Sequence, residues 1–167
     1  MAVTGANPNK GRQTGMVGGM TWNVQAFPST PTLSYTSGKI LGGVMAFNSI
    51  LNSYTGVMNS INISDSANQS GAMNIYIFNT LPVGTYTDGA SFTMNSTDLQ
   101  NCIYCYSVQA STSSWVSGGG CAVASITGLG KEIASSNPTV LWVLAVAQGS
   151  YTYAANSLTF TLGMLQD

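Results

Sequence analysis

From residue 32 onward, apolar and polar residues alternate in short runs, which are separated by clusters of turn-forming residues. In the clearest run, Leu158, Phe160, Leu162 and Met164 fall on one side of an extended chain. Alternation with a period of two is typical of a β-strand, whose successive side chains point to opposite faces. Strands are therefore predicted over the ranges 33–35, 39–47, 57–63, 75–79, 99–108, 121–126, 139–148 and 158–165.

Three of these runs carry further information. The pair Gly42-Gly43 interrupts the second run and predicts a bulge or a close approach of another backbone. In the third run, Val57, Ile61 and Ile63 are expected to share one face. The run from Val140 to Ala147 is apolar on both faces, which predicts a buried central strand.

About eight short strands joined by turns predict an all-β antiparallel fold, either a sandwich or a barrel. The alternation pattern alone does not separate these two architectures. Nowhere does the sequence hold the 3.6-residue period of a long amphipathic helix.

Residues 1–31 differ in composition and pattern: they contain scattered Pro, Gly and basic residues and show no sustained hydrophobic period. We interpret them as an extended N-terminal arm that precedes a β-sandwich domain over residues 32–167. The apolar residues Trp22, Val24 and Phe27 need a burial site, so they are the candidates for binding the body or a neighbouring subunit. A flexible tail is the alternative interpretation of the arm.

Charge is scarce: 5% of the 167 residues are charged, against about 25% in an ordinary soluble domain. The absence of histidine excludes Ser-His-Asp and Cys-His catalysis within the chain, and any zinc site that contains histidine. Four basic residues are too few to neutralise a phosphate backbone, so no nucleic-acid partner is expected. No enzymatic activity and no cofactor are predicted.

The remaining surface is polar without being charged, because Ser, Thr and Asn supply 53 residues and the net charge is −1. Such a surface offers little electrostatic repulsion, which favours a protein that works packed against copies of itself or another protein. The longest apolar run, from Val140 to Ala147, is too short for a transmembrane helix, which needs about 20 residues. No leader and no membrane partner are therefore expected.

The three cysteines are an odd number, so at least one is unpaired or bridges two chains. Cys102 and Cys105 form a C-x-x-C within a predicted strand, where residues three apart face opposite sides. Zinc would need a fourth ligand from elsewhere, and a redox-type turn is lacking. Together with Cys121, they are predicted to be structural free thiols that behave as small buried hydrophobes.

Other candidates for chemistry have simpler explanations. Asp88 and Asp98 could form a glycosidase pair, but both lie in turn-forming sequence, where a carboxylate bonds local N–H groups. Asp65 is interpreted in the same way, and Gly118-Gly119-Gly120 as a flexible loop. In the segment Tyr151-Thr152-Tyr153, the two tyrosines are the best candidates for an exposed pair that contacts a sugar.

Several segments between residues 35 and 167 together resemble structural proteins of tailed bacteriophages. They match an opening strand, a strand and turn, an acidic turn, and two late strands with the chain end. The segments are Tyr35–Gly43, Ile75–Pro82, Thr87–Phe92 with Ser96–Asp98, Leu141–Val146, and Asn156–Leu162 with Gln166-Asp167. Lys39 and Asn79 stand where that pattern has an acid, so contacts made by those acids are not carried over.

The resemblance implies a capsid decoration, or cement, protein with a jelly-roll-like β-sandwich. Such a protein sits on the capsid exterior of the virion, after synthesis in the host cytoplasm. It binds major capsid protein subunits as a homotrimer, and Trp22, Val24 and Phe27 would be its anchors in a neighbour. A chain without residues 1–31 is then expected to fold but to assemble poorly. A phage fibre or carbohydrate-binding β-domain that acts in surface recognition is the alternative.

Overall fold

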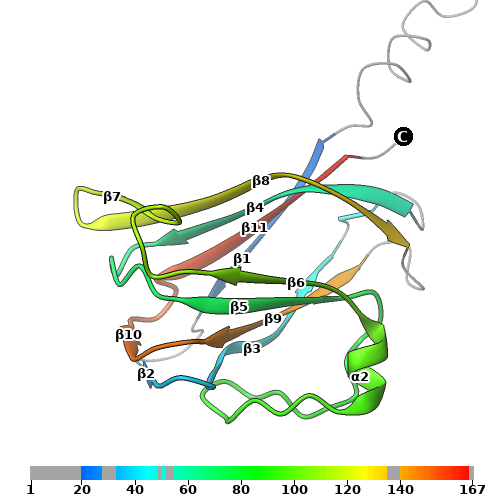
Figure 1. Ribbon diagram of the computed structural model, residues 1–167, viewed down its shortest axis with the longest axis horizontal. Helices are drawn as coiled ribbons and strands as arrows, with labels where there is room; N and C mark the ends of the chain where they lie inside the picture. The colour runs from blue at the N-terminus through cyan, green and yellow to red at the C-terminus, as the bar shows by residue number, and fades with distance from the viewer. Residues whose placement is uncertain (1–19, 28–32, 49, 52–54, 135–139, 166–167) are drawn as a thin grey trace, which may run out of the picture.

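The computed structural model describes residues 20–27, 33–48, 50–51, 55–134 and 140–165. Two antiparallel sheets face each other, which makes the fold an all-β sandwich as predicted (Figure 1). The five-stranded sheet has the order β1 (Met20–Phe27), β11 (Leu158–Leu165), β4 (Thr55–Asp65), β8 (Cys121–Ala134) and β7 (Val116–Gly118).

The four-stranded sheet has the order β3 (Ile40–Phe47), β9 (Leu141–Ala147), β5 (Met73–Phe78) and β6 (Cys102–Val108). A small third sheet pairs β2 (Leu33–Tyr35) with β10 (Tyr151–Tyr153). One short helix, α2 (Ser96–Asn101), precedes β6. The predicted central strand is confirmed, because β9 lies inside the four-stranded sheet and its residues are mostly buried.

Pairing between the long strands is nested along the chain. Strand β1 pairs with β11, β3 with β9, β4 with β8, and β5 with β6, all antiparallel. The chain thus follows the path of a long hairpin that is folded over on itself. Pairing of β11 with β4 joins the strands of the five-stranded sheet, and pairing of β5 with β9 joins those of the four-stranded sheet. The three remaining strands, β2, β7 and β10, have three residues each.

The main core lies between the two sheets and is built from alternate residues of their strands. On β11 the predicted apolar face is confirmed, since Leu158, Phe160, Leu162 and Met164 are all 0% exposed. On β4 the predicted face is partly wrong. Met58 is buried instead of Val57, because a bulge between Met58 and Ser60 shifts the alternation by one residue.

Two further predictions need correction. Residues 99–101 were expected to begin a strand, but they belong to α2, which Asn95 caps by accepting a hydrogen bond from the Asp98 N–H. No strand was predicted within the extended arm, yet residues 20–27 form β1, which pairs with β11 at eight positions. The rest of the arm lies outside the described residues, and the division at residue 31 stays a prediction.

Candidate functional site

The outer face of the five-stranded sheet is uncovered in the described part of the chain and carries hydroxyl and amide groups. Strand register aligns them in rows across β8, β4 and β11, for example Ser125 beside Asn62 and Asn62 beside Thr161. We call this surface the polar face; its described members are Asn62, Ser64, Val123, Ser125, Thr127, Thr159 and Thr161. None of these members is charged, and the exposed Glu132, paired with Val57, lies at the end of the same sheet. The polar face can therefore meet another neutral surface with little electrostatic repulsion.

The predicted arm residues lie in β1, at the margin of the same sheet. Trp22 pairs with Gly163 and Val24 with Thr161, whose row continues into the polar face. Phe27 pairs with Leu158 instead, which is buried in the main core. Strand register thus separates Phe27 from the two other residues, which the sequence pattern grouped as one set of anchors.

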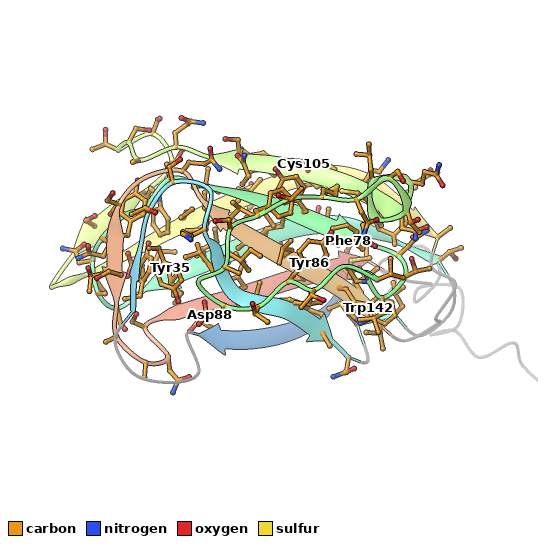
Figure 2. The ribbon with its side chains drawn as sticks, turned by 90° about the horizontal axis from the view of Figure 1, so that it is seen from below. Tyr35, Phe78, Tyr86, Asp88, Cys105 and Trp142 are labelled. Carbon is orange, nitrogen blue, oxygen red and sulfur yellow. The ribbon has the colours of Figure 1, made fainter. Side chains whose placement is uncertain are left out.

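The outer face of the four-stranded sheet is covered by the chain itself. Residues 79–95, here called the covering segment, run from β5 to α2 along this sheet (Figure 1). A second apolar cluster lies beneath it, in which Tyr86 of the segment packs with Phe78, Leu144 and Val146 of the strands. Figure 2 shows Tyr86, Phe78 and Trp142 on this face. This layer explains why β5 and β9 are apolar on both faces.

Asp98 holds the covering segment in place. Its carboxylate is 0% exposed and accepts hydrogen bonds from the Val83 N–H (2.8 Å), the Gly84 N–H (2.9 Å), the Tyr86 hydroxyl (2.6 Å) and the Asn95 amide (2.9 Å). Burial acts to raise the pKa of Asp98, but the hydrogen bonds outweigh it and the pKa is lowered. Burial and the bond to Asp98 raise the pKa of Tyr86 to about 12.

Asp88 fixes the middle of the covering segment to β2 and β3. It accepts hydrogen bonds from the Tyr35 hydroxyl and the Gly42 N–H, both at 2.8 Å. The predicted bulge is confirmed, because the register shifts between Leu41 and Met45 and both glycines have a positive φ. The predicted close approach is confirmed too, since a Cβ at Gly43 would lie 3.1 Å from the Tyr86 carbonyl oxygen.

The carboxylates therefore act as structural acceptors of hydrogen bonds. Asp65, also 0% exposed, accepts from the backbone N–H groups of Ala67, Gln69 and Ser70, which confirms its predicted role in a turn. Asp98 was expected to bond only nearby groups, but Val83 and Gly84 are 15 and 14 residues away. Sequence reasoning missed this link because nothing in the local pattern marks a contact across a folded-back segment.

The cysteines are free, as predicted, but two of them are exposed instead of buried: Cys105 and Cys121. A bulge in β6 also overturns the prediction that Cys102 and Cys105 face opposite sides. Cys102 pairs with Phe78 of β5, and Cys105 pairs with Tyr76. Because these two partners are two residues apart, both cysteines lie on the outer face of the sheet. Burial raises the pKa of both thiols, which keeps them protonated and weakly nucleophilic at neutral pH.

The predicted exposed pair of tyrosines is wrong. Tyr153 is 0% exposed and belongs to the main core, while the half-buried Tyr151 accepts a hydrogen bond from the Ala72 N–H. Both lie in β10, which pairs with β2. A shallow hollow of about 180 Å³ is present elsewhere, lined by Ser70, Ala110, Ser111, Thr112, Trp115 and Ser117. This lining offers hydroxyl groups but no acid or base for proton transfer.

Among the described residues, no group of three or more His, Cys, Asp or Glu side chains could hold a metal ion. The same residues include no helix that is long and apolar enough to cross a membrane. No known family and no curated protein matches the sequence of this chain.

Proposed function

We propose that this chain is a structural virion protein that decorates and stabilises the exterior of a tailed-phage capsid. It binds major capsid protein subunits, with three copies in each unit. The observation that carries the proposal is the polar face: a broad surface of Ser, Thr and Asn across three long strands, without a charged member. Such a face suits binding by area, and repeated copies add avidity through a high effective concentration.

The nested strand pairing supports the same proposal. A jelly roll is a long hairpin rolled so that its first strand lies beside its last, and β1·β11, β3·β9, β4·β8 and β5·β6 follow that order. Viral capsid proteins and lectins both use jelly rolls. The fold alone therefore does not choose between a shell protein and a sugar-binding domain, and the surface has to decide.

The exposed tyrosine pair that favoured a sugar-binding role is not present, because Tyr153 is buried and the Tyr151 hydroxyl accepts a hydrogen bond from the Ala72 N–H. The hydroxyl-lined hollow at Trp115 is the place left for such a ligand. A glycan array with the purified chain tests this alternative. Specific binding that is lost in Ser117→Trp, which fills the hollow, would favour recognition over decoration.

The decisive experiment is electron microscopy of phage shells that lack decoration, after incubation with this chain. We expect symmetric extra density and a markedly lower occupancy for Ser125→Glu, which places a charge on the polar face. Thr93→Glu is the matched control, because Thr93 is exposed on the covering segment at the opposite face. Shells that stay bare with the unchanged chain, or equal occupancy for both variants, would refute the proposal.

A further inference from the structure

Strand β6 is the outermost strand of the four-stranded sheet, and within the described residues only its β5 side is paired. It reads Cys-Ile-Tyr-Cys-Tyr-Ser-Val, with no Gly, Pro or charged residue. An unpaired strand presents a row of N–H and C=O groups that can pair with another chain. The side-chain hydrogen bonds of this strand are local, such as the bond from the Gln109 amide to the Ser107 hydroxyl.

Two other margins of the sandwich, at β8 and at β3, carry features that oppose such pairing. Beyond β7, the edge of β8 is broken by Gly128 and Gly130, both with positive φ, and then carries Lys131 and Glu132. The edge of β3 is occupied by the covering segment, whose Ala90 carbonyl accepts from the Ile40 N–H. Bulges, charges and covering chain are the usual means of protecting an edge. Strand β6 has one bulge, at Ile103, but within the described residues it has no charge and no covering chain, so it is the less protected edge of the four-stranded sheet.

We propose that in solution, away from the shell on which three copies form a unit, two copies of this chain pair antiparallel through their β6 strands. A two-fold axis normal to a sheet places one residue opposite its own copy. We place the axis at Cys105, the middle of this seven-residue strand, because the bulge at Ile103 then lies outside the three central pairs. Tyr104 of each copy then lies opposite Tyr106 of the other, and the two four-stranded sheets become one continuous sheet.

Charge and side-chain chemistry favour a second copy over another partner. The sequence has no charged residue between Asp98 and Lys131, so two β6 edges meet without like-charge repulsion. A charged peptide would find no counter-charge there. The rings of Tyr104 and Tyr106 are stacked in each chain, with centroids 6.5 Å apart, and both side chains are half-buried. Pairing in this register places the two stacks side by side as a cluster of four tyrosines.

The register makes a covalent test possible, because it brings the two exposed Cys105 side chains face to face. Directly opposite residues of an antiparallel pair have Cβ atoms about 4.5–5.5 Å apart, close to the separation of about 3.5–4.5 Å in a disulfide. Glutathione disulfide is a suitable oxidant: the two Cys105 thiols form one disulfide, and the oxidant is reduced to two glutathione thiols. The reaction is run at mildly alkaline pH to supply thiolate.

The experiment compares two variants of the full chain, each with one cysteine left. Cys102→Ser with Cys121→Ser keeps Cys105, and Cys102→Ser with Cys105→Ser keeps the equally exposed Cys121. Light scattering without oxidant should give a dimer mass for the unchanged chain and for both variants. After oxidation, a non-reducing gel should show a linked dimer only when Cys105 is present. Equal linking through Cys121 would overturn the proposal.

A charge at the axis tests the pairing without oxidation. Cys105→Glu places like charges opposite each other and should raise the dimer Kd about tenfold or more. Cys121→Glu is the control, with an unchanged Kd expected. Urea unfolding checks that both variants fold. If Cys105→Glu does not fold, Ser107→Lys is used in its place. A monomer at every concentration, a trimer without a Cys105 link, or open-ended aggregates would each overturn the proposal, whatever the shell-binding experiment shows.

Discussion

Ser125 is exposed, and Asn62 and Thr161 are half-buried, on the outer face of the five-stranded sheet. On the other sheet, Phe78, Leu144 and Val146 lie under a second layer. The two faces differ because the chain leaves the first sheet bare and folds back over the second. A bare face must be polar to stay hydrated, and a covered face must be apolar to hold its cover. Under the proposed function, the first sheet binds the partner, while the second contributes internal stability.

The largest expected effect concerns the edge of the bare sheet. Removing residues 1–31 also removes β1 and leaves the eight paired positions on β11 without partners. The free energy of unfolding should fall by about 4 kcal/mol or more, since about eight backbone bonds are lost and each contributes about 0.5–1.5 kcal/mol. Removing residues 1–19, which keeps β1, is the control and should cost less. Urea unfolding measures both; equal midpoints would mean that β1 does not contribute to the sheet.

Asp98→Ala should damage the covered sheet almost as much. It leaves four buried or half-buried donors without their acceptor, which costs on the order of 3 kcal/mol. Ser125→Ala on the polar face should change stability by less than about 0.5 kcal/mol. Urea unfolding compares the two variants, and similar losses would contradict the division of roles between the sheets.

Gly43→Ala tests the close approach of the covering segment to β3. The added Cβ would lie 3.1 Å from the Tyr86 carbonyl oxygen, at a backbone φ of +78° that favours glycine. A loss of about 1–2 kcal/mol is expected in urea. Gly118→Ala, where a Cβ meets nothing within 4 Å, is the control. A stable Gly43→Ala protein would show that the segment can move away at little cost.

Alkaline pH should loosen the covered face before the bare one. The pKa of Tyr86 rises from 10.0 to about 12 in the folded protein, so the folded state holds its proton longer than the unfolded state. This contribution is complete below pH 10 and is lost as the pH rises to about 12, at up to about 1.4 kcal/mol per pH unit. Thermal unfolding of Tyr86→Phe should show a weaker dependence over that range. An identical dependence would contradict the role of this tyrosine.

The smallest effect is expected from salt. Because the polar face has no charged member, shell occupancy should change little between low and high ionic strength. Occupancy measured by electron microscopy at both conditions checks this. A steep decrease with salt would mean that the few charges outside the polar face carry the binding.

Individual strands show how much of the fold could be predicted from the sequence. The face of β11 was predictable because Leu158 to Met164 alternate without interruption, and the Gly42-Gly43 bulge because the pair breaks a run. The face of β4 was predictable for Ile61 and Ile63 but not for Val57, because the residue inserted near Asn59 reverses the alternation before it. For the polar face, the composition predicted a polar and uncharged surface, but it did not predict which sheet carries that surface.

The sequence by itself determined the class of fold and the neutrality of the surface, since both follow from alternation and composition, which are local and additive. Tertiary structure decided which face is covered, because that depends on where residues 79–95 return and on Asp98 bonding to Val83 and Gly84. It also decided that residues 20–27 form a strand and that β6 is the less protected edge of its sheet. These features depend on hydrogen bonds between distant segments, which no local pattern records.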